Sequence, residues 1–251
     1  MTEIGVGFLA EIGSLHYTAH SDGKPFDLNN NHEGNLTAIP VYSCLIEHPD
    51  GLVLFDAGVS VYSYPPVPEE QTPLYCLRKL GVDPGDIRYA VCSHLHFDHS
   101  GYLKYLQNAK IVVHANEFNN IHNEMYDQKD VAEWTAAGLN WQPVSGRLEI
   151  KGLLPGIEII ALGPGHSFGM LALLVRLAGS GNIILAADAV YCRENVGPPV
   201  APPGIIYDTG GYIKSLEFLL QTAKDNNAQI WYGHDMEQFN TLFQYENGCY
   251  E

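Results

Sequence analysis

The chain has 251 residues, of which 29 are Asp or Glu and 13 are Lys or Arg, so its formal charge is −16. This acidity argues against nucleic acid as a partner, because phosphate binding depends on Lys and Arg. With 46 % hydrophobic and 17 % charged residues, the composition is typical of a chain that folds around a full core rather than a disordered one.

Short apolar runs rich in Val, Ile and Tyr predict buried strands. In chain order they cover residues 39–46, 52–55, 89–92, 111–113, 157–162, 171–175, 183–187 and 230–232. Helical patterns lie between them at 72–80, 116–125, 130–137 and 212–223, and Asn, Gly and Pro mark loops at 29–35, 64–68 and 197–204. Strands on both sides of several helices predict a layered α/β domain, and their even spacing predicts one domain over residues 1–251.

The chain carries no pattern that directs it to a membrane or an oxidising compartment. Its first residues lack the basic region of a signal peptide, and no stretch approaches the roughly 20 apolar residues of a membrane span. The five cysteines are odd in number and widely spread, so we expect no disulfide framework and a cytoplasmic location. Cys92 is interpreted as a buried strand residue rather than a metal ligand.

The most informative stretch is Ser-His-Leu-His-Phe-Asp-His-Ser-Gly at 93–101, directly after a predicted strand. It places four possible metal donors within six positions: His94, His96, Asp98 and His99. Packing does not explain them, because each buried imidazole has two ring nitrogens that need partners. Neutral imidazole and carboxylate are preferred zinc donors, and alternate residues of an extended segment point the same way. The cluster therefore predicts a metal site.

Four donors in one segment cannot complete a two-metal site, so this interpretation predicts further donors at later strand ends. His166, Asp188 and His234 each stand in a short segment that follows a predicted strand. Small residues stand beside each of them, which would let the backbone approach a crowded centre.

These motifs, in this order, resemble the metallo-β-lactamase-fold hydrolases over nearly the whole chain. Within that superfamily the sequence is most similar to the N-acyl-homoserine lactonases. Three segments carry this similarity: residues 93–99, Asp-Ala-Val-Tyr at 188–191 and Gly-His-Asp-Met-Glu-Gln at 233–238. Residues 39–48 are also similar to the 4-pyridoxolactonases. The resemblance implies an α/β (α+β) fold, an αββα sandwich of two similar halves with the metals at one edge between the sheets.

The resemblance also implies a ligand set for two Zn²⁺ ions, although Fe, Mn or Co would tolerate the same donors. The implied ligands are His94, His96 and His166 for one ion, Asp98, His99 and His234 for the other, and Asp188 bridging both. Two of the site residues are expected to be catalytic. Asp98 would pass a proton to the leaving alkoxide, and Tyr191 would hydrogen-bond the lactone.

The resemblance thus implies a hydrolase that opens a lactone ring with hydroxide held between two zinc ions. The substrate expected first is N-acyl-L-homoserine lactone, whose hydrolysis is called quorum quenching. Alternatives stay open: another lactone, ester or thioester, as in 4-pyridoxolactonase or glyoxalase II, or a protein that binds a lactone without turnover. A di-iron flavoprotein is disfavoured, because that branch usually has Glu where His96 stands. The expected partner is a small-molecule lactone, and the chain is expected to be a monomer or a homodimer.

Two residues depart from the family pattern, and a third allows two interpretations. Met170 stands where the family often has a second His, and Tyr102 replaces a second glycine and is expected to place an aromatic ring near the cavity. Asp56 matches a strand-end aspartate of the family. It either orients a ligand or is a plain turn carboxylate.

The remaining histidines are not expected to bind metal. His16, His20 and His32 are interpreted as exposed, and His48, His114 and His122 as structural.

A set of aromatic and apolar residues could line an acyl pocket, although buried packing explains them equally well. They are Leu15, Tyr17, Phe26, Tyr62, Tyr64, Pro65 and Pro66.

Overall fold

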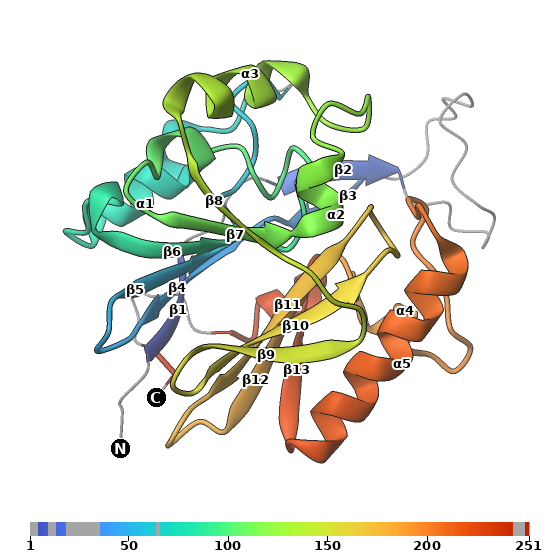
Figure 1. The fold of residues 1–251 in the computed structure, drawn as a ribbon. Helices are drawn as coiled ribbons and strands as arrows, with labels where there is room; N and C mark the ends of the chain where they lie inside the picture. Colours follow the sequence, from blue (N-terminus) through green and yellow to red (C-terminus); the bar gives the residue numbers. More distant parts are fainter. Residues whose placement is uncertain (1–4, 10–13, 19–35, 64–65, 243–248, 251) are drawn as a thin grey trace.

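Two β-sheets lie face to face in the middle of the molecule, and helices cover their outer faces (Figure 1). The computed structural model describes residues 5–9, 14–18, 36–63, 66–242 and 249–250. The first sheet has the strand order β1-β4-β5-β6-β7-β8. Its strands are β1 (Gly5–Leu9), β4 (Ser43–Glu47), β5 (Leu52–Phe55), β6 (Ile87–Val91), β7 (Lys110–His114) and β8 (Asn140–Val144).

The second sheet has the order β13-β12-β11-β10-β9. It consists of β9 (Glu149–Leu154), β10 (Ile157–Gly163), β11 (Met170–Arg176), β12 (Asn182–Ala187) and β13 (Ala228–Tyr232). A separate antiparallel pair joins β2 (Ser14–Thr18) to β3 (Leu36–Pro40). Strands β5 to β8 run parallel to one another, as do β12 and β13. Their carboxyl ends provide the places where functional loops are commonly found in such sheets.

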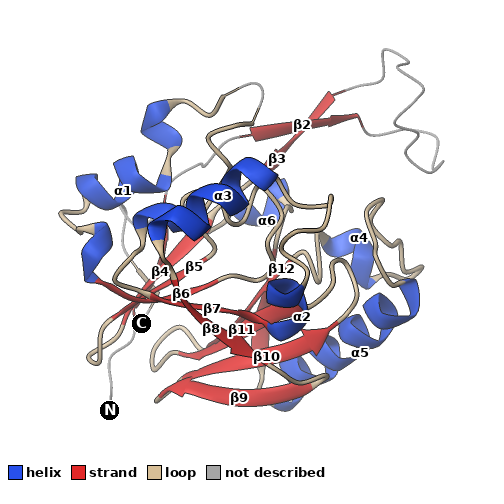
Figure 2. Cartoon of the chain, turned by 45° about the horizontal axis from the view of Figure 1, so that its top comes forward, coloured by secondary structure: helices blue, strands red, loops and turns tan. Residues whose placement is uncertain are grey.

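The helices form the outer layers (Figure 2). On the side of the first sheet lie α1 (Pro73–Lys79), α2 (Ala115–Asn119) and α3 (Gln128–Ala137). The long α5 (Thr209–Asp225) covers the second sheet, with the short α4 (Arg193–Val196) and α6 (Met236–Phe239) at connections. Local sequence starts these helices where they begin. For example, Thr72 caps α1 by accepting a hydrogen bond from the Tyr75 amide, and Pro73 occupies the first turn.

Alternating side chains along the strands divide the core into layers. On β4, Cys44 and Ile46 face the second sheet, whereas Leu45 faces the helices of the first. On β11, Leu171 and Leu173 point between the sheets, and Ala172 packs toward α5. The helix–sheet–sheet–helix sandwich predicted from the resemblance is thereby confirmed.

The predicted elements are largely present, with three corrections. Residues 39–46 form two strands, because the chain leaves β3 at Pro40 and joins the first sheet only at Ser43. The helix expected over 116–125 ends at Asn119 and continues as turns. Strands β1, β2, β8 and β9 were not expected; β8 and β9 lie at sheet edges and alternate little between apolar and polar residues. Within the described residues, no helix is both long and apolar enough to cross a membrane.

One buried carboxyl group lies away from the predicted site. Asp130 on α3 is 2 % exposed, and no hydrogen bond of normal geometry reaches either of its oxygens. Burial raises its pKa to about 6, and the nearby Asp127 and Glu133 add to this rise. The Ser60 hydroxyl and the Lys104 ammonium offset only part of it. The charged form of Asp130 therefore destabilises the fold.

We expect Asp130→Asn to stabilise the protein at pH 7.5 and to have little effect at pH 4. Because the pKa of Asp130 is raised in the folded state, the native protein keeps this proton to a higher pH than the unfolded chain does. The free energy of unfolding therefore falls as pH rises from about 4 to about 6. The substitution removes that loss, which is worth about 1–2 kcal/mol, or roughly 3–6 °C in melting temperature for a chain of this size. Thermal unfolding at both pH values tests this, and an equal shift at the two would contradict it.

Candidate metal centre

The seven predicted ligands meet at one edge of the sandwich, each in a loop at the end of a strand. His94, His96, Asp98 and His99 occupy the loop after β6, and His166 lies between β10 and β11. Asp188 follows β12 directly, and His234 follows β13 after one glycine. Both sheets therefore contribute donors, which fall into two groups: His94, His96, His166 and Asp188 in one, and Asp98, His99 and His234 in the other.

In the first group, three imidazoles point their nitrogens at one place. His96 Nδ1 lies 2.9 Å from His94 Nε2 and 2.9 Å from His166 Nε2. Asp188 Oδ2 lies 3.2 Å from His166 Nε2 and 3.7 Å from His94 Nε2. His94 and His166 are completely buried, so bulk water does not reach these two donors.

In the second group, the other oxygen of the same carboxylate faces two imidazoles. Asp188 Oδ1 lies 3.1 Å from His99 Nε2 and 3.0 Å from His234 Nε2. Asp98 Oδ2 closes this group at 3.6 Å from His99 Nε2 and 3.8 Å from His234 Nε2. Asp188 thus presents one oxygen to each group, which is the arrangement of a carboxylate that can bridge two cations.

The donor atoms fit a divalent cation better than they fit one another. His96 Nδ1 has at most one proton to donate, yet it faces two imidazole nitrogens. His99 Nε2 and Asp188 Oδ1 are buried without a hydrogen bond of normal geometry. Buried polar atoms are rarely left in this state. A positive ion in contact with these lone pairs would satisfy them all.

The far ring nitrogens of the histidines are held by hydrogen bonds that fix which nitrogen carries the proton. Four Nδ1 atoms can donate in this way: His94 to Ser93 Oγ, His99 to Asp56 Oδ2, His166 to the Ile205 carbonyl and His234 to the Pro40 carbonyl, at 2.8–3.0 Å. Each bond leaves Nε2 as an acceptor directed inward. Such outer contacts are typical of metal-binding histidines.

Asp56 is one of these outer partners, which decides between the two interpretations that its sequence left open. Its Oδ2 accepts from His99 Nδ1 and from the Ser93 hydroxyl, and its Oδ1 accepts from the Ser93 amide at 2.7 Å. Asp56 adopts a left-handed backbone with φ 58°, as does Ala187 before Asp188 with φ 44°. Non-glycine residues in this region store strain, which is common next to functional groups.

Charge is divided between the two groups. Burial holds the pKa of His94 and His166 below the usual value and lowers that of His96 to about 3. For His99 and His234, burial acts in the same direction, but Asp188 and Asp98 outweigh it and the pKa is raised. Burial opposes ionisation of Asp188, yet its histidine neighbours hold its pKa well below the usual value. The first group therefore offers neutral imidazoles, which need lose no proton to bind a metal.

Known proteins with similar sequences and structures place this site in a family. A model of the metallo-β-lactamase superfamily matches residues 36–234. N-acyl homoserine lactonase AiiB of Agrobacterium fabrum is 33 % identical over 239 residues, which cover 86 % of this chain and 87 % of AiiB. The chain belongs to the metallo-β-lactamase superfamily.

Other relatives in the superfamily agree. An N-acyl homoserine lactonase of Bacillus thuringiensis is 30 % identical, with 82 % of this chain and 85 % of the relative covered. A crystal structure of a quorum-quenching N-acyl homoserine lactone lactonase has a TM-score of 0.84 at 28 % identity, with 98 % of each chain covered. The predicted resemblance and the predicted class, a hydrolase of ester bonds, are confirmed. The superfamily and the two donor groups together imply a divalent metal.

The departures from the superfamily pattern lie outside the donor groups. Met170 is buried between the second sheet and α5, where its sulfur accepts a hydrogen bond from Ser167. Tyr102 packs into the core of the first sheet and stacks on Tyr105, with ring centroids 5.8 Å apart. The expectation that Tyr102 lies near the cavity is wrong, because its side chain lines a pocket with Thr72 and Leu74 at the start of α1, and none of the seven predicted ligands lines that pocket.

A chain of aromatic side chains that the sequence did not single out begins at His96. Tyr126 lies 6.1 Å from His96 between ring centroids and 6.0 Å from Phe168, which in turn lies 4.4 Å from Tyr207. The predicted Tyr191 lies 5.4 Å from His166 and 4.8 Å from His234, so it faces both donor groups. Phe168 stands within the Gly-His motif, but no local pattern marks Tyr126 or Tyr207.

The other described residues that were considered from the sequence belong to neither donor group. Tyr62 packs against the ammonium groups of Lys104 and Lys129 rather than lining an apolar pocket. His48 and His114 are buried and hydrogen-bonded to backbone, and Cys92 is buried, as expected, whereas His122, which was expected to be structural, is exposed. Leu15, His16 and Tyr17 lie on β2. His20, Phe26, His32, Tyr64 and Pro65 lie outside the described residues.

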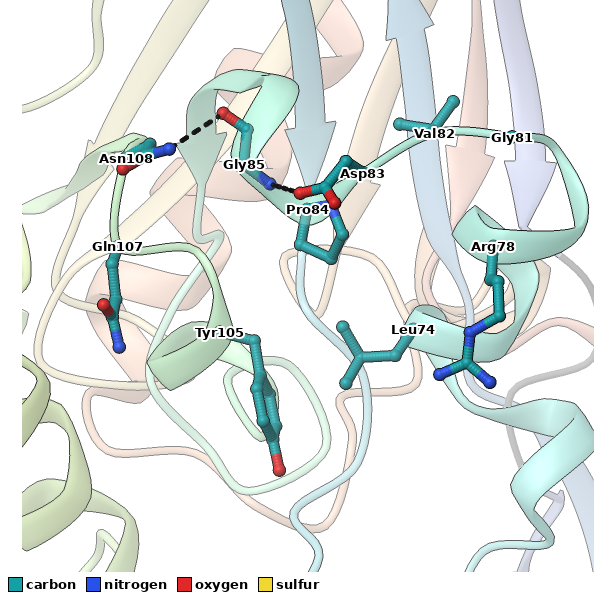
Figure 3. Close-up of a pocket in the computed structure, with 10 residues that line it drawn as sticks. All are labelled: Leu74, Arg78, Gly81, Val82, Asp83, Pro84, Gly85, Tyr105, Gln107 and Asn108. Carbon is teal, nitrogen blue, oxygen red and sulfur yellow. Dashed lines mark hydrogen bonds between the residues drawn. The ribbon is translucent and has the colours of Figure 1, made fainter.

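A pocket of about 670 Å³ lies elsewhere, beside α1 and the turns at 84–86 and 103–105 (Figure 3). Leu74, Arg78 and Tyr105 line it, and Asn108 donates a hydrogen bond to the Gly85 carbonyl at its rim. None of the seven predicted ligands lines this pocket. It is therefore separate from the metal centre.

Proposed function

We propose that this protein is a metal-dependent lactonase that opens the ring of N-acyl-L-homoserine lactones, a quorum-quenching activity. The observation that carries the proposal is Asp188, whose two oxygens face two separate groups of buried donors. The names of the relatives from Agrobacterium fabrum and Bacillus thuringiensis support the choice of substrate.

The proposal assigns two divalent ions, with zinc as the first choice, to these donors. Imidazole and carboxylate are the ligands that zinc accepts in hydrolases. One ion would be held by His94, His96 and His166 and the other by Asp98, His99 and His234, with Asp188 shared between them. When bound, such ions polarise an ester carbonyl and make water acidic enough to react near neutral pH.

The protein supplies the remaining groups. Tyr191 faces both donor groups, so its phenol can donate a hydrogen bond to the lactone carbonyl or ring oxygen as negative charge develops there. Asp98 is placed to accept the proton of the attacking water and to deliver it to the ring oxygen that leaves. The half-buried Phe168 and the exposed Tyr207 provide an apolar surface for an acyl chain, and the buried Tyr126 packs behind Phe168 and beside His96.

A substrate panel with metal analysis tests this function. Ring opening releases one proton, so rates are measured by proton release with homoserine lactones of several acyl lengths, with 4-pyridoxolactone and with an acyl-glutathione thioester. We expect the homoserine lactones to react fastest, activity to disappear after chelation, and elemental analysis to find two ions per active chain. A faster reaction with either competitor would change the substrate, and metal-loaded protein that binds lactone without releasing acid would overturn the enzymatic function.

A further inference from the structure

Glu117 is a buried carboxyl group that the proposed reaction does not use. It lies on α2 and is 0 % exposed. Its Oε2 accepts hydrogen bonds from the Leu95 amide at 3.0 Å and from the Tyr126 hydroxyl at 2.6 Å. Its Oε1 accepts from the Gly169 amide at 2.7 Å. A charged group this deeply buried is retained only where several donors compensate its desolvation.

Two of these donors belong to the two loops that carry the first group of histidines. Leu95 stands between His94 and His96 in the loop after β6, and Gly169 stands three residues after His166 in the loop before β11. These loops leave different sheets. One carboxylate therefore links them, with one oxygen for each loop.

The chain leaves little freedom around this link. A Cβ atom at Gly169 would lie 2.1 Å from His114 Nδ1, so only glycine lets the loop approach this closely. The adjoining strand is tied by a second bond, from the Leu171 amide to the Ser93 carbonyl at 2.8 Å. On the far side of its ring, His166 donates a hydrogen bond from Nδ1 to the Ile205 carbonyl.

We propose that Glu117 is a positioning residue that sets the distance between the His94–His96 pair and His166, and so shapes one of the two metal sites. This inference rests on the proposed assignment of those histidines as ligands. Glu117 contacts none of the donors of the second group among the hydrogen bonds described for it. Its loss should therefore affect one ion and spare the other.

Glu117→Gln separates this role from simple packing, because the amide has the same size. An amide has one acceptor oxygen, so its NH₂ group must face either Gly169 N–H or the pair Leu95 N–H and Tyr126 O–H, and donor then meets donor. We expect one Co²⁺ affinity to fall by about 10–100-fold while the other stays unchanged. The measurement is competition with a chromophoric chelator, together with the visible absorption of the Co²⁺-loaded protein.

Two further variants complete the test. Glu117→Asp keeps the charge, but its side chain is too short to reach both loops. If the Gln variant fails to fold, the Asp variant should show the same result, a fall in one Co²⁺ affinity with the other unchanged. Val131→Ala, in the core on α3, should lower the melting temperature without changing either affinity. Equal affinities in wild type and both Glu117 variants, or an equal fall in both affinities, would overturn the role of Glu117. Wild-type protein that binds no Co²⁺ would instead overturn the metal assignment itself.

Discussion

Replacement of Asp188 by Asn is expected to reduce the rate of lactone opening by at least about 10³-fold, since a catalytic metal contributes several kcal/mol and about 4 kcal/mol corresponds to that factor. The amide has nearly the same shape, but it carries no charge and offers one acceptor instead of two. Only one of the two donor groups could then keep its contact. Elemental analysis after desalting is expected to find fewer than two ions per chain.

The matched control is Asp86→Asn, at an exposed turn remote from the ligand loops. It changes the net charge by the same amount and should leave rate and metal content unaltered. Circular dichroism of both variants confirms that the fold is present. An Asp188→Asn protein that keeps two ions and most of its activity would show that this carboxylate does not bridge metals.

Asp56→Asn is expected to weaken the binding of one metal ion and to lower the rate by about 10–100-fold, the usual effect of losing a partner of a metal-binding histidine. Asp56 Oδ2 accepts from both His99 Nδ1 and Ser93 Oγ, and an NH₂ group at that position would face two donors. His99 would then turn or change tautomer, and its Nε2 would no longer be directed at the second group.

Asp56→Ala distinguishes this effect from backbone strain. The left-handed backbone at φ 58° suits Asn but costs Ala about 1–2 kcal/mol. We therefore expect both variants to lose metal affinity, and the Ala variant alone to lose several degrees of melting temperature beyond that. Metal titration and thermal unfolding are measured on the same samples. If metal affinity is unchanged in both variants, Asp56 does not orient His99 for metal binding and serves only in the turn.

The sequence was sufficient for those features that depend on local pattern. The buried strands β5, β7 and β10 to β13 appear within a few residues of their expected ranges, because a strand covered on both faces reads as an apolar run. The donor groups were predictable because His94, His96, Asp98 and His99 crowd into one segment, and the later donors each follow such a strand.

Features that depend on tertiary contact were not predictable in this way. The edge strands β8 and β9 contain Pro143 and several exposed polar residues, so they carry little alternation. Glu117 looks like any glutamate of a short helix until the fold brings Leu95 and Gly169 to it. Tyr102 was assigned to the cavity from its place beside a ligand loop, but the direction of a side chain depends on the layer in which it packs.

The order of the ligands along the chain has a consequence for how the protein matures. The first four donors are made early, but Asp188 follows β12, 89 residues after His99, and His234 follows β13. A nascent chain that ends before β13 lacks a member of the second group, and one that ends before β12 lacks the shared carboxylate as well. Such long-range contacts form late, because loop closure must precede them. Under the proposed ligand assignment, the full centre would therefore form only after both sheets are built, and the ions would then link the first sheet to the second.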